Sequence, residues 1–403
     1  MAFALGWRGY PGKAVRLGRR GCADCGCISA RGWALTVYCR PFDWQRSSSA
    51  RRHLARWREV RRRDSTMVAA ERQSATGGAP TTTLHVVVNP MAGNGRAGRR
   101  WPEYAKHLRA AGYDFKAYLT TGAGEATDIA RRLARHDVPI LVCVGGDGTM
   151  NEVVNGLIDA DRPVSEHTRL LVIPCGTGHD LSRSLGVRSV EDAIRALRDD
   201  CVATIDVGRI SYLDTQTGQL TSRYFANVAD AGLGGATALR INRTSKRFGG
   251  LVSYMSSAVR SVASFEPVTV DVTADGETVF DGRANMVVFA NGAHFAGGMR
   301  VAPMASLCDG RLEVFVLEDV GRRALITDIM PRVYRGSHVG RPGVRHLSAT
   351  RATVRCDEGM LIEMDGEQIG QTPIEVVVVP RALRVFGLPE TLQLFGGCTD
   401  PSQ

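Results

Sequence analysis

Lysine is scarce in this 403-residue chain, which contains only Lys13, Lys106, Lys116 and Lys246. None of the four lies in a glycine-rich segment, so the lysine of a Walker A phosphate loop is absent. No stretch of 18 consecutive apolar residues occurs either, so we expect no membrane-spanning helix. With 44% apolar residues, the chain has enough material to bury a large core.

Positive charge is concentrated near the start of the chain. Residues 1–66 contain 15 Lys and Arg against 4 Asp and Glu, a net charge of +11. Because the whole chain carries +10, residues 67–403 carry −1, and we expect no nucleic-acid partner. Residues 1–81 lack hydrophobic periodicity, which predicts a disordered extension. This extension is either sequence upstream of a true start at Met67 or a basic arm that targets membranes.

The cysteines after this extension show no pairing pattern. They are dispersed and lie mostly in apolar runs: Cys143, Cys175, Cys201, Cys308, Cys356 and Cys398. We therefore expect reduced thiols, as in a cytoplasmic protein.

Three apolar runs each lead into a glycine-rich segment. Ile140–Val144 precedes Gly145-Gly146-Asp147-Gly148-Thr149, Leu84–Val88 precedes Asn89–Gly98, and Leu170–Ile173 precedes Pro174–Asp180. Glycines without Cβ atoms let backbone N–H groups approach an anion, and a following helix adds its dipole. A tight turn is the alternative for any one loop. Three of them predict a phosphate site at the carboxyl edge of a parallel sheet.

The residues after Gly148 have the pattern of a helix. Met150, Val153, Val154, Leu157 and Ile158 form one apolar face, and Asn151, Glu152 and Asn155 lie away from it.

The pattern of elements changes along the chain. From residue 82 to about 207, strands alternate with helical segments, which predicts an α/β nucleotide-binding domain with a parallel sheet. From 208 to 381, short strands separated by Gly and Asp predict an antiparallel β-sandwich. Its expected strands are 268–272, 286–290, 312–317, 353–356, 361–364 and 374–379.

Together these segments resemble the diacylglycerol kinase catalytic family, which includes bacterial soluble lipid kinases and sphingosine kinases. The resemblance covers about residues 82–387 and continues in 290–292, 297–303, 305–314 and Asp365-Gly366-Glu367. NAD kinases share the Gly-Gly-Asp-Gly loop but do not typically carry the later Asp-Gly segments in this form. One departure is His179, where the family usually has Asn. The resemblance also implies that residues 382–396 return to complete the first domain.

The resemblance implies a lipid kinase that uses ATP and Mg²⁺ and converts diacylglycerol to phosphatidic acid. A sphingoid or other lipid alcohol as substrate, or a nucleotide-binding regulator without turnover, remain alternatives. The expected nucleotide contacts are Asn89, Pro90, Met91, Ala92, Gly93, Thr120, Gly145, Gly146, Asp147, Gly148, Thr149, Met150, Asn151 and Thr177.

Metal and catalytic residues follow in the same way. Asp147 is a candidate ligand of catalytic Mg²⁺, directly or through water. By resemblance, Ser306, Asp309 and Arg311 bind a second, structural Mg²⁺. Glu367 resembles the proposed proton acceptor, with Asp365 beside it, although Asp-Gly alone would indicate a hairpin turn. Which of Asp147, Asp365 and Glu367 is the base stays open.

A lipid kinase must also reach a membrane surface. The basic segment around Arg240, Arg243 and Arg247 is either a helix that lies on anionic headgroups or an ordinary solvated face. We expect a cytoplasmic protein at the inner face of the membrane, and the sequence leaves a homodimer open.

Overall fold

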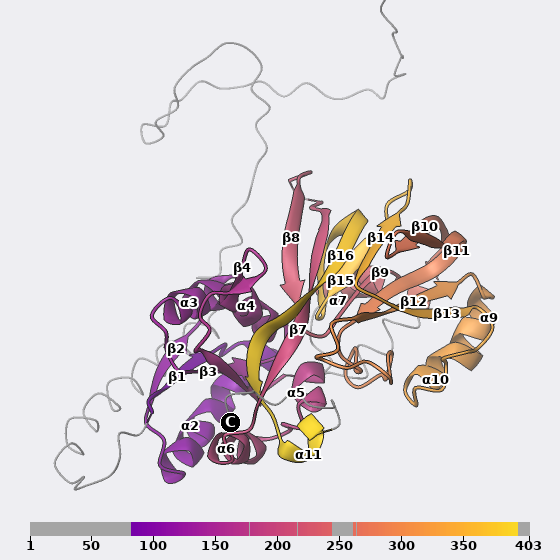
Figure 1. The fold of residues 1–403 in the computed structure, drawn as a ribbon. Coiled ribbons are helices and arrows are strands. Elements are labelled where there is room, and N and C mark those ends of the chain that lie inside the picture. Colours follow the sequence, from indigo (N-terminus) through magenta and orange to yellow (C-terminus); the bar gives the residue numbers. More distant parts are fainter. Residues whose placement is uncertain (1–81, 177, 216, 244–260, 263, 394–403) are drawn as a thin grey trace, which may run out of the picture. The chain divides into compact units, whose positions relative to one another are not determined.

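The structure is a computed structural model that describes residues 82–176, 178–215, 217–243, 261–262 and 264–393 (Figure 1). The expected extension at residues 1–81, Thr177, Arg247 and Cys398 lie outside these described residues.

The first part of the described chain is an α/β layer structure. Its parallel strands are β1 (Leu84–Val88), β2 (Phe115–Leu119), β3 (Ile140–Gly145) and β6 (Arg169–Pro174), in the order β6-β3-β1-β2. The helices are α2 (Ala92–Ala110), α3 (Glu125–Ala134), α4 (Asp147–Leu157), α5 (Asp180–Ser184) and α6 (Val190–Arg198), and a small hairpin joins β4 (Ile158–Asp159) to β5 (Arg162–Pro163). All six residues of β3 are buried, as expected for a central parallel strand.

Parallel pairing brings the three glycine-rich segments to one edge of this sheet. Val88 pairs with Val144, and Gly145 pairs with Pro174, so the strands end side by side. The predicted parallel sheet and the convergence of its loops are confirmed.

Helix α4 begins before Gly148, after which the sequence pattern predicts it. It is also buried beyond its predicted apolar face. Gly146 is the residue before the helix, so Asp147 and Gly148 belong to its first turn. The predicted apolar face is buried, but Asn151 is also only 1% exposed. Asn151 lies away from that apolar face and is buried because a strand of the second part, β8 (Leu220–Phe225), packs against its side of the helix.

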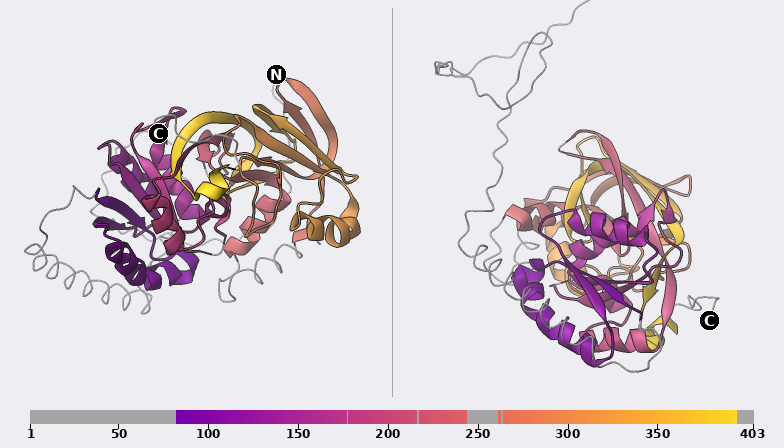
Figure 2. Two further views of the ribbon diagram at one scale, coloured as in Figure 1. Left: turned by 60° about the horizontal axis from the view of Figure 1, so that its bottom comes forward. Right: turned by 90° about the vertical axis from the view of Figure 1, so that its left-hand side faces the viewer.

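The second part consists of antiparallel strands with helices at one side (Figure 2). The strands are β7 (Val202–Leu213), β8 (Leu220–Phe225), β9 (Val228–Gly232), β10 (Val268–Ala274), β11 (Glu277–Ala290), β12 (Leu312–Glu318), β13 (Val344–Ala349), β14 (Arg351–Arg355), β15 (Leu361–Met364) and β16 (Glu367–Phe386). The helical elements are α7 (Leu233–Arg243), α9 (Gly321–Ala324), the π-helical turn η3 (Leu325–Ile329), α10 (Met330–Val333) and α11 (Pro389–Leu392).

Strands β7 and β16 join the two parts. Val385 of β16 pairs in parallel with Leu170 of β6, and β16 pairs along its length with β7. The C-terminal end of β16 therefore lies beside the parallel sheet of the α/β part. The boundary expected at residue 207 falls inside β7, so no linker separates the two parts there.

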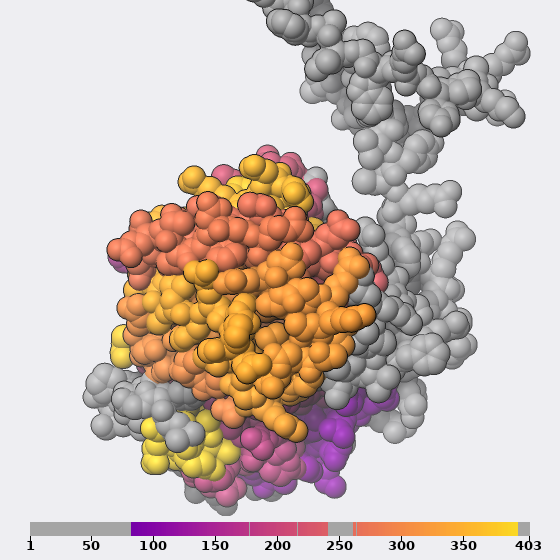
Figure 3. Space-filling model, turned by 90° about the vertical axis from the view of Figure 1, so that its right-hand side faces the viewer, coloured from indigo at the N-terminus to yellow at the C-terminus, as the bar shows by residue number. Residues whose placement is uncertain are grey.

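The central strands of the second part bury both of their faces. Ala229, Phe289 and Val314 point into the core between the sheets of the sandwich. Val288 and Phe315 alternate with them and point to the opposite face, where η3 and α10 cover them. Figure 3 shows this end of the molecule, where the segments coloured orange, including α10 and β13, form the middle of the surface.

Cysteine chemistry departs from expectation at one position. Cys143, Cys175, Cys201 and Cys356 are free thiols. Cys308 is disulfide-bonded, so the expectation of a reduced thiol is wrong there. Dispersal along a sequence does not report which cysteines meet in the folded chain.

Within the described residues, every helix is too short or too polar to cross a lipid bilayer.

Candidate active site

The first two glycine-rich loops are fixed to each other by side-chain contacts. Asn89 donates from Nδ2 to Thr149 Oγ1 at 2.9 Å, and its Oδ1 accepts from the backbone N–H of Met91 at 3.0 Å. A Cβ atom on Gly145 would lie 2.6 Å from the Cβ of Thr149, so only glycine fits there. The loop after β1 therefore lies directly on the first turn of α4.

The third loop closes over the other two. A Cβ atom on Gly176 would lie 2.8 Å from the Cα of Gly146, and one on Gly93 would lie 3.2 Å from the Cα of Gly176. His179 Nε2 accepts from the backbone N–H of Gly176 at 3.3 Å. This is the local contact affected by having His at position 179, where the family usually has Asn. Three glycine backbones in contact leave unobstructed N–H groups at the strand ends, as a phosphate site needs.

The remaining expected nucleotide contacts lie around these loops. Thr120 directly follows β2 and is 8% exposed, whereas Met91 is 57% exposed. Pro90 precedes Met91 in the loop, Ala92 begins α2, and Met150 is buried in α4.

The carboxylate of Asp147 is held by the third loop. Its Oδ2 accepts from the backbone N–H of His179 at 2.9 Å and its Oδ1 from that of Asp180 at 3.1 Å. A Cβ atom on Gly178 would lie 1.7 Å from Oδ2. Burial raises the pKa of Asp147 although these hydrogen bonds oppose the rise. Asp147 therefore fixes the third loop to α4 as well as placing charge beside the phosphate loops.

Asp180 is a further buried acid that the sequence analysis did not assign to the site. It is 4% exposed, and its Oδ2 accepts from the backbone N–H of Gly297 at 2.8 Å. Its Oδ1 is buried without a hydrogen-bond partner among the described residues. Burial, followed by the charge of Asp147, raises the pKa of Asp180 to about 6. An orphaned carboxylate oxygen beside a second carboxylate fits the oxygen chemistry of Mg²⁺. Its position directly after a glycine loop was the available sequence signal.

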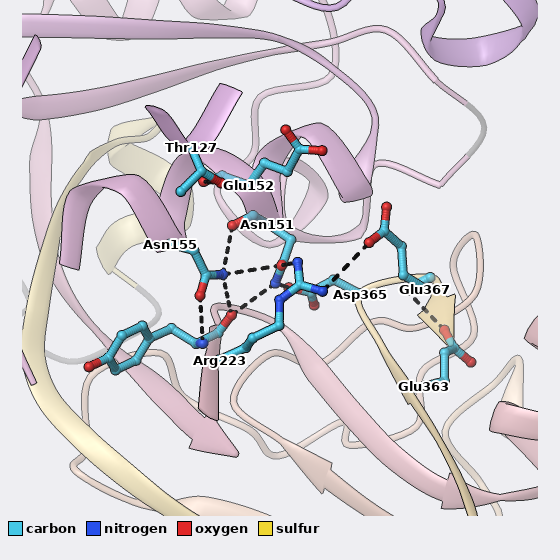
Figure 4. Close-up of polar contacts among 10 residues, drawn as sticks. Thr127, Asn151, Glu152, Asn155, Arg223, Glu363, Asp365 and Glu367 are labelled. Carbon is cyan, nitrogen blue, oxygen red and sulfur yellow. Dashed lines mark hydrogen bonds and ion pairs between the residues drawn. The ribbon is translucent and has the colours of Figure 1, made fainter. Parts of the chain in front are cut away.

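The Asp365-Gly366-Glu367 hairpin meets the first turns of α4 (Figure 4). Asn151 donates from Nδ2 to Asp365 Oδ2 at 2.9 Å, and the backbone N–H of Val228 donates to Asp365 Oδ1 at 3.2 Å. Burial raises the pKa of Asp365 to about 7. A carboxyl group that titrates near neutral pH is suited to accept a proton from a hydroxyl.

Glu367 lies over the glycine loop. A Cβ atom on Gly148 would lie 2.7 Å from Glu367 Oε1, and the side chain of Glu367 is 46% exposed. Arg223 Nη1 lies 3.9 Å from Glu367 Oε2, and Arg223 Nη2 donates to Asn151 Oδ1 at 3.0 Å. Glu367 therefore faces the phosphate loops, and Asp365 lies behind it against β9. Arg223 carried no sequence signal, because its strand β8 was not predicted.

The loop expected to hold a structural metal is anchored by Asp206. This residue of β7 is 1% exposed, and its carboxylate accepts from the backbone N–H groups of Gly310 and Arg381, each at 2.7 Å. Burial, then the charges of Glu313 and Asp206, raises the pKa of Asp309. This excess of negative charge fits a cation held partly by backbone carbonyls.

The other two residues expected to hold this metal differ from Asp309 in their surroundings. The Arg311 side chain turns away from the loop and donates from Nε to Ser348 Oγ at 2.8 Å, and Ser306 is half-buried. Within the described residues, no three Asp, Glu, His or Cys side chains surround one point.

An apolar cavity of about 120 Å³ lies beside the hairpin's sheet. Its walls come from β11, β12, η3 and α10, and include Val288, Phe295, Phe315, Leu317, Leu325 and Ile329. Side chains of this kind suit hydrocarbon chains.

Two family models match the chain in consecutive segments. The diacylglycerol kinase catalytic domain matches residues 83–210. The YegS C-terminal NAD kinase beta sandwich-like domain matches residues 227–387.

Individual proteins show the same similarity. The diacylglycerol kinase of Bacillus subtilis is 29% identical over 300 residues, which are 74% of this chain and 94% of that protein. The diacylglycerol kinase of Staphylococcus carnosus is 28% identical over 302 residues, 75% of this chain and 94% of that protein. A crystal structure of a diacylglycerol kinase from Bacillus anthracis superposes with a TM-score of 0.56 at 21% identity, and covers 78% of this chain and 100% of that chain. The folds are therefore the same.

Proposed function

We infer that this chain, whose residues 83–210 match the diacylglycerol kinase catalytic domain, transfers the γ-phosphate of ATP to the hydroxyl of diacylglycerol. The observation that carries this inference is the contact between the phosphate loops and the acidic hairpin, made by Asn151 and Asp365 at 2.9 Å. This contact supports a reaction in which a proton acceptor on the hairpin works beside a phosphate site.

The reaction forms one bond and breaks one. The lipid hydroxyl oxygen bonds to the γ-phosphorus while the bond from that phosphorus to the β,γ-bridging oxygen breaks, which gives phosphatidic acid and ADP. The hydroxyl proton passes to Asp365, whose pKa of about 7 leaves much of it ionised at neutral pH. Glu367 lies nearer the phosphate loops and, with Arg223, orients the hairpin over them.

Asp180 and Asp147 are the residues that would hold catalytic Mg²⁺, because Asp180 Oδ1 is buried without a partner among the described residues. The ion supplies charge neutralisation on the phosphate oxygens. Asp309, with backbone groups near Ser306 and Arg311, would hold the structural ion. Asp206 fixes that loop whether or not an ion is bound.

The lipid's chains would lie in the apolar cavity, so the enzyme must contact a membrane surface at least transiently. Arg240, near the end of α7, is a candidate for contact with anionic headgroups.

Phosphate transfer from radiolabelled ATP to lipids in detergent micelles tests the proposal. Diacylglycerol, a sphingoid base and glycerol are offered separately to the full chain with Mg²⁺, and Asp365→Asn serves as the inactive control. Labelled phosphatidic acid from the native chain alone supports the proposal. Label only on the sphingoid base would identify the alternative kinase, and ATP binding without transfer to any acceptor would identify a regulator.

A further inference from the structure

A short hairpin at residues 295–299 connects the apolar cavity to an acid beside the phosphate loops. Phe295 and Met299 exchange both of their backbone hydrogen bonds, each at 2.8 Å. Both residues line the apolar cavity. At the tip of the hairpin, the backbone N–H of Gly297 donates to Asp180 Oδ2 at 2.8 Å. One end of this hairpin therefore forms cavity wall, and the other end holds an acid of the candidate magnesium site.

Arg183 lies against the same hairpin tip. A Cβ atom on Gly298 would lie 1.9 Å from Arg183 Nη1, so the guanidinium group rests directly on this glycine. Asp180 and Arg183 are three residues apart on α5, and residues at this spacing share one face of a helix. The guanidinium group of Arg183 therefore lies at the end of the hairpin that also holds Asp180.

Two further arginines, Arg188 and Arg300, are exposed and lie with Arg183 around His294. The imidazole of His294 is half-buried, and its Nδ1 lies 3.4 Å from Ser184 Oγ. Burial, followed by the charges of Arg183, Arg300 and Arg188, lowers the pKa of His294 to about 4. His294 is therefore neutral at physiological pH, and the three guanidinium groups form a positively charged cluster around it.

This arginine cluster has no acidic partner within the described part of the chain. None of its guanidinium groups makes an ion pair or a hydrogen bond with another described residue. Even Asp180 Oδ1 is without a hydrogen-bond partner there, so Arg183 does not bond to it. Elsewhere, arginines bind carboxylates, as Arg169 binds Asp200 at 2.6 Å. Unpaired guanidinium groups that converge on one place favour an anion from outside the chain.

The position of Arg183 suits the phosphate of a lipid product. In the proposed reaction the lipid's chains lie in the apolar cavity and Mg²⁺ lies at Asp147 and Asp180. The new phosphate group must then lie between these two places, and the 295–299 hairpin spans the same interval. A guanidinium group binds phosphate oxygens with two parallel hydrogen bonds and also neutralises their charge.

Resting on the proposed function, we propose that Arg183 binds the phosphate that the reaction places on the lipid, and that Arg188 and Arg300 form the outer part of the same anion site. A phosphate monoester carries about 1.5 to 2 negative charges at neutral pH. The phosphodiester of an ordinary phospholipid carries less charge, and inorganic phosphate has no chains for the cavity. The site therefore selects phosphatidic acid, whereas uncharged diacylglycerol gains little from it.

The test measures how three anions inhibit the native full chain in the diacylglycerol assay with Mg²⁺ and ATP in neutral detergent micelles. The anions are a short-chain phosphatidic acid, phosphatidylmethanol with the same chains, and inorganic phosphate. Phosphatidic acid should inhibit at a concentration about tenfold or more below that of either other anion.

Each other result of this comparison decides against the inference. Equal inhibition by phosphatidylmethanol would assign the arginine cluster to phospholipid headgroups in general. Equal inhibition by inorganic phosphate would assign it to free phosphate. Absence of transfer to diacylglycerol would overturn the proposed function itself, and the inference with it.

Variants separate phosphate binding from a merely structural role of Arg183. Arg183→Gln should raise the inhibition constant for phosphatidic acid about tenfold or more, the size of one lost charge-assisted hydrogen bond, with little change in the KM for diacylglycerol. Arg183→Lys keeps the charge but loses the paired donors, so it should recover part of this loss. Arg169→Gln is the matched control, because it removes a half-buried arginine at the opposite end of β6 from the third glycine loop, and it should keep the native inhibition constant.

An unchanged inhibition constant in Arg183→Gln would contradict the inference. If this variant does not fold, the double variant of Arg188→Gln and Arg300→Gln takes its place, because both side chains are exposed and their replacement leaves the core intact. The double variant should also raise the inhibition constant for phosphatidic acid, and a native value would contradict the inference.

Discussion

Asn151 of α4 donates a 2.9 Å hydrogen bond to Asp365, a residue 214 positions later in the chain. Its own Oδ1 accepts from Arg223 of β8, which lies 3.9 Å from Glu367. One amide side chain therefore joins the helix of the phosphate loop to both acids of the hairpin. The relative placement of nucleotide and proton acceptor depends on this contact.

Asn151→Ala should lower kcat and shift the pH profile of kcat/KM upward. The hydrogen bond from Asn151 lowers the pKa of Asp365, so its loss makes the carboxyl group harder to ionise. The loss of one such bond should cost on the order of tenfold in kcat at pH 7. Rate profiles from pH 5.5 to 9 measure the shift.

Asn155→Ala is the matched control for this variant. Asn155 donates to the backbone oxygen of Tyr224 at 2.8 Å and accepts from its N–H at 2.9 Å, on the same strand that Asn151 contacts. Its loss should lower stability without moving the pH profile. Asn155 Nδ2 also donates to Asn151 Oδ1 at 3.2 Å, so a similar shift in both variants would show that the wider network of Asn151, Asn155 and β8 sets the pH profile, and not the bond to Asp365 alone.

Asp365→Asn and Glu367→Gln should differ in what they impair. If Asp365 accepts the hydroxyl proton, its replacement should lower kcat by about 10²-fold or more with little change in the KM for ATP. Glu367 lies against the glycine loop, so Glu367→Gln should also raise the KM for ATP. The reverse pattern in steady-state kinetics would assign the base to Glu367.

Asp147→Asn should abolish turnover and also weaken the fold. Asn keeps one of the two oxygens that accept from His179 and Asp180, so one hydrogen bond is lost, at about 1–2 kcal/mol of the free energy of unfolding. Urea denaturation measures the loss. Activity within about tenfold of the native chain, about 1.4 kcal/mol of barrier, would remove Asp147 from the mechanism.

The stability difference between the native chain and Asp365→Asn should depend on pH. The pKa of Asp365 is about 7 in the folded chain, and that of an unfolded Asp is about 4. Between these values the unfolded chain has released a proton that the folded chain keeps, so the native chain loses stability as the pH rises to about 7. Asp365→Asn has no ionisable group at this position, so its stability does not fall for this reason as the pH rises. Thermal denaturation at pH 5 and pH 8 without Mg²⁺ or nucleotide should show the native chain losing more; an equal change would contradict the raised pKa.

Local patterns predicted the elements that are continuous and buried. Residue ranges 84–88, 140–144 and 361–364 lie in strands as expected, because short apolar runs specify them without reference to the rest of the chain. Strands β7, β8, β9 and β13 were missed. These strands contain polar and small residues that show no clear alternation of apolar and polar positions. Their burial comes from pairing with neighbouring strands.

The sequence by itself determined the three phosphate loops, their place after parallel strands, and the acidic hairpin with its family resemblance. Tertiary structure alone decided that Asp147 binds the third loop, that Asn151 is buried against Asp365, and that Asp230 lies opposite Glu363. Glycine loops and apolar strands are specified by residues that are adjacent in the chain, so they can be recognised from the local sequence. Contacts between residues more than a hundred positions apart arise from strand register and sheet order, and a burial that raises a carboxyl pKa exists only once those strands have paired.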